Sequence, residues 1–243
     1  MSRESAVRIA VLLPELLGTY GDGGNGRILE RRLAWRGIAV ERIDCTGGTP
    51  IPEQADVYLL GGGEDRPQTL AARELRSSGA VNRAHVRGAV VFAVCAGFQI
   101  IGQSFPGAEG VEPGLSLIDI TTEVGPGPRC VGELAFEADP ILGLPTLSGF
   151  ENHQGVTRLG PGVEPLGRVV TGRGNGIHGV PIEGARAGRV VATYAHGPVL
   201  ARNPALADHL LSMVLGELAP LPLPEVDALR AERLRAVNKR TTK

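Results

Sequence analysis

Cys95 is the residue best placed in this sequence to act as a nucleophile. It directly follows the apolar run Ala89–Val94, which predicts a buried strand, and a short helix is expected after it. Ala93 and Gly97 flank it, and small side chains there suit the strained strand-to-helix turn of a nucleophile elbow. Such a turn presents the sulfur at the carboxyl edge of a sheet and at a helix N-terminus, where the thiolate is favoured. The alternative is a buried structural cysteine.

A nucleophilic cysteine needs a base, and His196 is the best candidate among the five histidines. It follows the predicted strand Arg189–Ala195 directly, so the strand end would hold the imidazole rigidly. If that strand joins the sheet that carries Cys95, the imidazole could take the thiol proton. The alternative is a structural histidine at a strand end. The other histidines considered fall in predicted helices or in a glycine-rich loop: His85, His209 and His178.

Attack on a carbonyl creates an oxyanion, which requires preorganised hydrogen-bond donors. The triplet Gly61-Gly62-Gly63 follows the predicted strand Asp56–Leu60 and can expose backbone N–H groups there. The N–H of Ala96, next to the nucleophile, is the natural second donor. Glycine is common in turns of every kind, so an ordinary turn is the alternative for the triplet.

The elements that must position these residues alternate along the first hundred residues. Short apolar runs predict buried strands, and the stretches between them have helical spacing. The expected strands are Val7–Leu13, Ala39–Asp44, Asp56–Leu60 and Ala89–Val94, and the expected helices are Arg27–Arg36 and a stretch from Pro67 to about Arg87. This alternation predicts an α/β fold with a mostly parallel open sheet and helices on both faces.

Beyond Gly102 the pattern changes, because glycine and proline become dense. Residues 116–123 and 131–137 are expected to be antiparallel additions to the sheet, and Pro204–Leu215 is expected to be a helix. Residues 1–219 are interpreted as one catalytic domain. Residues 220–243 are interpreted as a charged tail that either docks on a partner or remains solvated.

Composition narrows the classes of function. A formal net charge of −1 gives no bulk attraction to nucleic acid or to a membrane surface. The apolar runs are too short to span a bilayer. The three cysteines form neither a paired framework nor a metal-ligand cluster, and no signal peptide is recognised, so a reducing cytoplasm is expected. No metal and no cofactor are predicted for this chain.

Three segments together resemble the class I glutamine amidotransferases, in their cobyric-acid-synthase-like branch. They are Cys-Ala-Gly-Phe-Gln at residues 95–99, Tyr-Ala-His-Gly-Pro at residues 194–198 and Gly-Phe-Glu-Asn-His-Gln-Gly at residues 149–155. Residues 18–25 and 61–68 are most similar to the glutaminase subunits of lipid II isoglutaminyl synthases. The likeness covers about Val7 to Leu218 and implies a flavodoxin-like fold.

The resemblance implies that Cys95 and His196 hydrolyse the side-chain amide of L-glutamine through a thioester. The ammonia would pass to a Mur-ligase-like synthetase, in a heterodimer, which uses ATP to amidate D-isoglutamate of the peptidoglycan precursor lipid II. This chain itself would bind no ATP. By the same resemblance, the oxyanion donors would be Gly63 and Ala96. Gln99 would line the glutamine pocket, and Arg129 would bind the substrate α-carboxylate. Asn152 and His153 would be pocket or structural residues.

One position departs from the family pattern. Many members carry a glutamate two residues after the catalytic histidine, and here that position is Pro198. A proline cannot orient an imidazole, so the sequence predicts either a Cys–His dyad or a third member from elsewhere, for which an acid of the synthetase partner is our hypothesis.

Other functions compete with this interpretation. A cobyric-acid-type amidotransferase normally sits behind an ATP-using domain, yet this sequence has no phosphate-binding Gly-x-x-x-x-Gly-Lys-Ser/Thr run. A γ-glutamyl hydrolase would use the same residues. A non-catalytic binding subunit that kept the fold would have no need of an intact Cys95 and His196.

Overall fold

The core of the molecule is a six-stranded sheet in the order β13-β14-β4-β3-β1-β2. The strands are β1 Val7–Leu12, β2 Val40–Cys45, β3 Val57–Leu60, β4 Val90–Val94, β13 Ala185–Ala187 and β14 Val190–Thr193. The computed structural model describes residues 5–241, and side chains only through residue 237. All neighbouring strands are parallel except the edge pair β13 and β14. The structure confirms the predicted open, mostly parallel sheet, and its order from β2 to β14 is the flavodoxin-like one.

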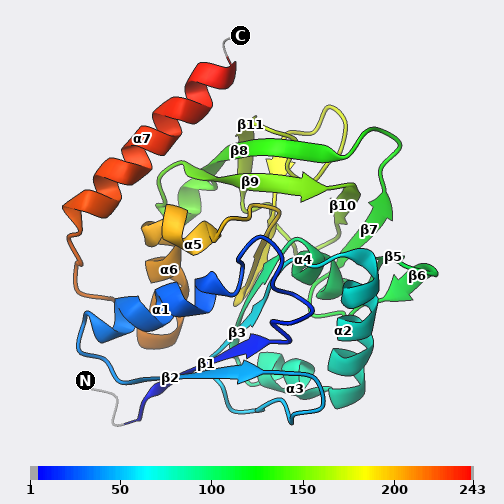
Figure 1. The fold of residues 1–243 in the computed structure, drawn as a ribbon, viewed down its shortest axis with the longest axis horizontal. Coiled ribbons are helices and arrows are strands. Elements are labelled where there is room, and N and C mark those ends of the chain that lie inside the picture. The colour runs from blue at the N-terminus through cyan, green and yellow to red at the C-terminus, as the bar shows by residue number, and fades with distance from the viewer. Residues whose placement is uncertain (1–4, 242–243) are drawn as a thin grey trace.

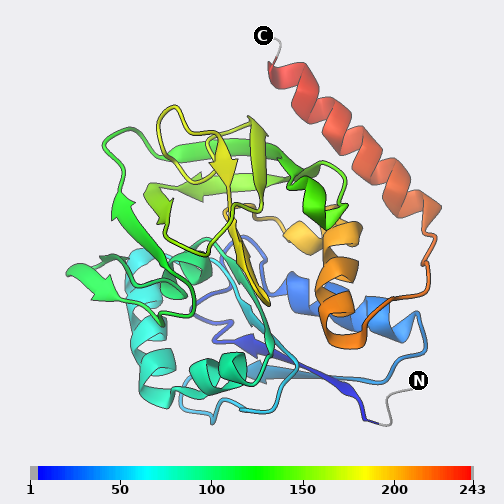
Figure 2. The ribbon, with the colours of Figure 1, turned by 180° about the vertical axis from the view of Figure 1, so that it is seen from behind.

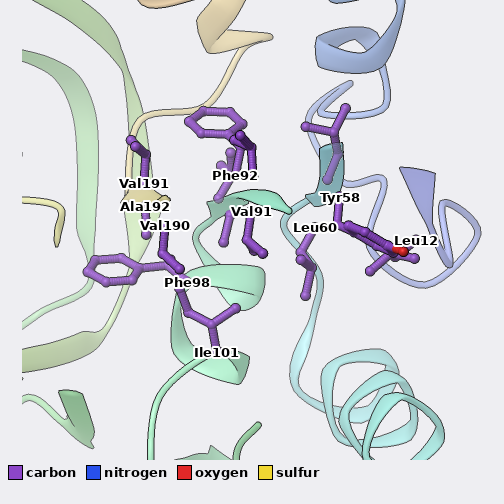
Figure 3. Close-up of a cluster of buried hydrophobic side chains, with 14 of the residues drawn as sticks. Leu12, Tyr58, Leu60, Val91, Phe92, Phe98, Ile101, Val190, Val191 and Ala192 are labelled. Atoms are coloured by element: carbon purple, nitrogen blue, oxygen red, sulfur yellow. The ribbon is translucent and has the colours of Figure 1, made fainter. Parts of the chain in front are cut away.

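The central strands are buried on both faces, which explains their nearly continuous apolar sequences. Every residue of β3, β4 and β14 is buried. Figure 3 shows Val91 and Phe92 of β4 packed beside Val190 of β14, with Phe98 and Ile101 from the segment after β4. This core fixes the strand ends from which the candidate site residues project.

Helices cover both faces of this sheet (Figures 1 and 2). One face carries α1 Gly24–Ala34, α5 Val199–Arg202 and α6 Pro204–Leu215, and the other carries α2 Asp65–Ser78 and α3 Ala80–Val86. The single helix expected from Pro67 to Arg87 is therefore wrong. Gly79, at φ 61°, ends α2 in the left-handed conformation that terminates many helices, and α3 starts immediately after it.

Two smaller sheets of four strands each are built on this core, and all of their neighbouring strands are antiparallel except β5 and β7, which are parallel. One has the order β10-β7-β5-β6, and the other has the order β12-β11-β8-β9. Their strands are β5 Ser104–Gly107, β6 Gly110–Pro113, β7 Ile120–Val124, β8 Cys130–Ala138, β9 Leu147–His153, β10 Gly155–Leu159, β11 Gly167–Thr171 and β12 Ile182–Glu183, with a short 3₁₀ turn at Pro140–Leu142. The expected additions at residues 116–123 and 131–137 correspond to β7 and β8. Ser116 is not in a strand, because the chain turns there at φ 53°.

The last element is the helix α7, Pro224–Thr241, which runs along the outside of the molecule (Figures 1 and 2). It is tied to the body by Arg230, which donates to the carbonyl of Thr146, and by the buried side chain of Val237. None of the helices within residues 5–241 is both long enough and apolar enough to cross a membrane.

Candidate active site

Cys95 lies on the strained turn that its neighbours predict. It directly follows β4 and precedes the short helix α4, Ala96–Ile100, with φ 50° and ψ −102°. A side chain other than glycine adopts this conformation only at a cost, so the surrounding packing has to hold it. Gly97 makes room, because a Cβ there would lie 2.6 Å from Cβ of Leu60. The backbone N–H of Cys95 donates to the carbonyl of Thr193 at 2.9 Å, which fixes the turn against β14.

His196 reaches the same end of the sheet from the neighbouring strand. Val94 of β4 is in register with Thr193, so both chains leave the sheet side by side. The strand ends at Thr193 and not at Ala195 as predicted, which places His196 three residues beyond it. Its backbone is held instead by a bridge to Phe150 of β9, with the His196 N–H donating to the Phe150 carbonyl at 2.8 Å.

The two residues between β14 and His196 are fixed by a buried carboxyl group. Oε1 of Glu183 accepts from the Tyr194 N–H at 2.9 Å and from the hydroxyl of Thr193, and that hydroxyl accepts from the Ala195 N–H at 3.0 Å. Burial raises the pKa of Glu183 to about 7, even though these hydrogen bonds favour the ionised form. This buried group therefore helps to set the path of the chain into His196.

The structure supplies an acid for His196 from within the same chain. Nδ1 of His196 lies 2.7 Å from Oδ2 of Asp22, and both side chains are buried. The same oxygen accepts from the Gly62 N–H at 2.9 Å. The site is therefore a Cys–His–Asp arrangement. Of the two alternatives that the sequence left open, a dyad or a third member from elsewhere, the geometry favours the second, with the acid next to His196 coming from this chain and not from a partner.

Asp22 lies in the turn at residues 18–24, which follows β1 and leads into α1. This loop is docked on the glycine triplet by a bridge between Thr19 and Gly62. It also packs against Pro198, because a Cβ at Gly24 would lie 2.6 Å from Cγ of that proline. The signal that could have revealed Asp22 was an acid in a turn at the carboxyl end of a parallel strand, where ligands and catalytic groups gather.

The charge state of His196 follows from these neighbours. Burial of the ring opposes the imidazolium, but the Asp22 carboxylate and Cys95 outweigh burial and raise the pKa of His196 from 6.5 to about 10. Nε2 has no hydrogen-bond partner among the described residues, although Cys95 is close enough to contribute to that pKa. Catalytic hydrogen bonds are often long until the substrate is bound. Nε2 is therefore the nitrogen available to the sulfur.

The glycine triplet is required by this packing. A Cβ at Gly62 would lie 2.4 Å from Cε1 of His196 and 2.9 Å from Oδ2 of Asp22. A Cβ at Gly61 would lie 2.0 Å from the carbonyl oxygen of Leu17. The backbone alone fits at these positions, which leaves the next residue, Gly63, at the wall of the cavity beside Cys95.

A cavity opens beside Cys95 and gathers all of the predicted pocket residues. Its lining comprises Gly63, Asp65, Gln68, Cys95, Ala96, Gln99, Pro106, Gly107, Val124, Arg129, Asn152, His153, Gln154 and Gly155. His196 is not part of this lining and stays buried. Opposite charges, on Asp65 and Arg129, border the same space. Asp65 and Gln68 are cavity residues to which the sequence assigned no role.

Gln99 is held at both ends of its amide. Its Oε1 accepts from Nε2 of Gln68 at 2.8 Å, and its Nε2 donates to the Tyr194 hydroxyl at 3.2 Å. That hydroxyl lies 2.6 Å from Oγ1 of Thr157, and the Tyr194 ring stacks on His153 with centroids 3.7 Å apart. The network fixes which end of the amide faces the cavity. His153 thus has a structural contact as well as a place in the wall.

Arg129 and Asn152 are joined directly. Arg129 donates through Nε to Oδ1 of Asn152 and through Nη2 to its carbonyl oxygen, the latter at 3.1 Å. These bonds use one edge of the guanidinium and leave the edge formed by Nη1 and Nη2 for a second planar acceptor, such as a carboxylate. No group of three or more His, Cys, Asp or Glu side chains among the described residues could hold a metal ion.

Comparison with known proteins agrees with this geometry. Residues 8–204 match the model of the CobB/CobQ-like glutamine amidotransferase domain. Similar proteins are the lipid II isoglutaminyl synthase (glutamine-hydrolyzing) subunits GatD of Staphylococcus aureus (strain N315), 33% identical over 82% of this chain and 80% of that protein, and of Streptococcus pneumoniae (strain ATCC BAA-255 / R6), 34% identical over 86% and 80%. A solved glutamine amidotransferase shares the fold, with a TM-score of 0.57 at 22% identity, over 85% of this chain and 98% of that one. The chain therefore belongs to the CobB/CobQ-like glutamine amidotransferase family.

Proposed function

We propose that this chain is the glutaminase subunit of a lipid II isoglutaminyl synthase and that it hydrolyses L-glutamine through a Cys95 thioester. The observation that carries the proposal is the arrangement at the end of the central sheet. A strained cysteine, a buried His196 and an Asp22 carboxylate 2.7 Å from that histidine meet beside one cavity. This is the geometry of an acyl-transfer nucleophile with its base and its orienting acid.

The charges at the cavity suit a free amino acid. Arg129 offers an open guanidinium edge to an α-carboxylate, and Asp65 offers a carboxylate to an α-ammonium group. With both ends of the zwitterion held, the side-chain amide of glutamine would reach toward Cys95. Gln99, whose orientation is fixed by Gln68 and Tyr194, would line the space between.

The proposed reaction proceeds in two halves. The Cys95 thiol passes its proton to Nε2 of His196 and its sulfur attacks the amide carbon, while the resulting oxyanion accepts from the backbone N–H groups of Gly63 and Ala96. His196, protonated on Nε2, gives its proton to the departing nitrogen, so the C–N bond breaks and ammonia leaves. A water molecule then attacks the thioester while His196 takes its proton. Glutamate departs, and His196 returns the proton to the Cys95 sulfur, which restores the thiol. Asp22 holds the ring of His196 in place in both of its protonation states.

The destination of the ammonia is proposed from the relatives. The two similar GatD proteins are named as glutamine-hydrolyzing subunits of lipid II isoglutaminyl synthases. We infer that this chain forms a heterodimer with a Mur-ligase-like synthetase in the cytoplasm. The partner would use ATP to activate D-isoglutamate of lipid II, and this chain would need neither a metal nor a cofactor of its own.

A cobyric-acid-type amidotransferase or a γ-glutamyl hydrolase is the second candidate. The family model that matches the chain is CobB/CobQ-like, and the chemistry at Cys95 would be the same. The acceptor distinguishes these functions, because amidation of a lipid II stem peptide requires the synthetase. A non-catalytic binding subunit would show no labelling of Cys95 by a glutamine-mimicking electrophile that glutamine protects against.

The decisive experiment is a glutaminase assay of the wild type, Cys95→Ala and His196→Ala, each alone and with a co-purified synthetase. We expect glutamate release by the wild type and none above background by Cys95→Ala. With the synthetase, ATP and lipid II, we expect amidation of the stem peptide. Glutamate release that survives Cys95→Ala would overturn the proposed chemistry. Glutaminase activity without any amidation would overturn the proposed pathway.

A further inference from the structure

Tyr20 occupies an unusual place beside the catalytic histidine. It is a non-glycine residue at φ 59° in the loop that carries Asp22, so its backbone is held in a conformation that side chains disfavour. Its side chain is 43% exposed, yet its ring meets the ring of His196 edge-on, with centroids 4.9 Å apart, and lies 6.2 Å from the ring of Phe150. A glycine would adopt this backbone conformation without that cost but would lack the ring that contacts His196.

The hydroxyl group of Tyr20 is connected to the cavity. Nδ2 of Asn152 donates to this hydroxyl, and Asn152 in turn accepts from Arg129. The three residues come from separate parts of the chain: the loop after β1, the strand β9 and the turn before β8. The chain of contacts therefore runs from the cavity, through Asn152, to the ring that covers His196.

We propose, on the basis of the glutaminase function above, that Tyr20 is a positioning residue that links occupancy at Arg129 to the orientation of His196. Asn152 holds one edge of the guanidinium, and the substrate α-carboxylate would take the other. A bound carboxylate fixes Arg129, which fixes Asn152 and the Tyr20 hydroxyl. Tyr20 and Asp22 are two residues apart in the same loop, and the ring of one and the carboxylate of the other both contact the imidazole of His196.

The proposal predicts a loss in kcat and not in glutamine binding. Tyr20→Phe keeps the ring against His196 and removes only the hydroxyl link. We expect its kcat to fall about tenfold, the value of one ordinary hydrogen bond expressed in the transition state, with KM for glutamine within about threefold of the wild type. Tyr58→Phe is the matched control, since its hydroxyl also accepts a hydrogen bond but lies away from the cavity. Its kcat is expected to stay unchanged.

A double-mutant cycle with Arg129→Lys separates positioning from general loosening of the loop. Both substitutions break the same link, so the double variant should have a kcat close to that of the worse single variant. Multiplicative losses in the cycle, or a Tyr20→Phe enzyme with wild-type kcat, would overturn the role of Tyr20 while leaving the glutaminase assignment intact. A wild-type enzyme without Cys95-dependent hydrolysis would contradict both proposals.

Discussion

Replacing Asp22 by asparagine tests the third member of the site with the least change in shape. Two donors converge on Oδ2 of Asp22, namely the Gly62 N–H at 2.9 Å and Nδ1 of His196 at 2.7 Å. An asparagine is expected to turn its carbonyl oxygen toward both, because its NH2 group would confront the Gly62 N–H. That NH2 group then takes the place of Oδ1, which has no hydrogen-bond partner among the described residues. The substitution thus removes the charge and retains the tautomer.

The size of the effect follows from that distinction. A hydrogen bond to a charged group contributes about 1.5–3 kcal/mol, so Asp22→Asn should lower kcat/KM by about 10- to 150-fold. Asp22→Ala removes the acceptor altogether and frees the imidazole tautomer, and knocking out the acid of a comparable triad costs roughly 3 × 10⁴-fold in kcat. The alkaline limb of the pH–rate profile, near the wild-type pKa of about 10 for His196, should move toward neutral pH in both variants.

The same raised pKa has a consequence for stability. The charged ring beside Asp22 stabilises the folded chain fully below pH 6.5, and this contribution is lost as the pH rises through about 10. Steady-state glutamate release from pH 6 to 10.5 measures the shift of the pH–rate profile. Circular dichroism over the same range follows the loss of folded protein. Asp44→Asn, at a half-exposed carboxylate on β2, is the control. Equal activity of wild type and Asp22→Ala would refute the triad. If the synthetase restored the glutaminase activity of Asp22→Ala, the partner and not Asp22 would supply the catalytic acid.

Three further changes test other parts of the site. Gly62→Ala should lower kcat at least about 100-fold, because its methyl group would lie 2.4 Å from the imidazole Cε1, whereas Gly23→Ala, with open space at its Cβ, should not. Arg129→Lys should raise KM for glutamine about tenfold or more, measured by initial rates, because a lysine cannot pair bidentately with a carboxylate. The raised pKa of Glu183 means that, between pH 4.5 and pH 7, the folded state keeps a proton that the unfolded state has lost. The free energy of unfolding of the wild type should therefore fall by roughly 3 kcal/mol over this range. In Glu183→Gln this fall should be absent. Denaturant unfolding across that range checks this, with the exposed Glu123→Gln as control.

The central sheet could be predicted because its central strands are buried on both faces. Apolar runs such as Val7–Leu13 and Ala89–Val94 carry that signal in sequence alone, and the structure places strands there within a residue or two. The break at Gly79 was not predicted, because a single glycine within a helical pattern often continues the helix. Most of the small antiparallel strands were missed. They are short and lie in glycine- and proline-rich sequence, and their long-range pairing gives no local period.

The residues of the candidate site also differ in how well the sequence alone predicts them. Cys95 and His196 could be located from sequence because each follows a recognisable apolar run. Asp22 was missed, because its partner is 174 residues away and its own surroundings have the composition of an ordinary turn, so only its place at the end of a parallel strand could have indicated a role. Gln68 was missed for a similar reason, since its contact with Gln99 depends on how α2 packs against α4.

The position of Asp22 also changes where a partner can regulate this glutaminase. An acid supplied by the synthetase would couple hydrolysis to assembly by completing the site, but here the acid is buried beside His196 and held by Gly62. Any control by the proposed synthetase partner would then have to act on groups that a partner can reach. The exposed ring of Tyr20 satisfies that requirement, because it lies on the loop that carries Asp22 and contacts the imidazole directly. A partner that presses on this loop would tune the orientation of the base, whereas one that touches only α7 would leave the site unchanged.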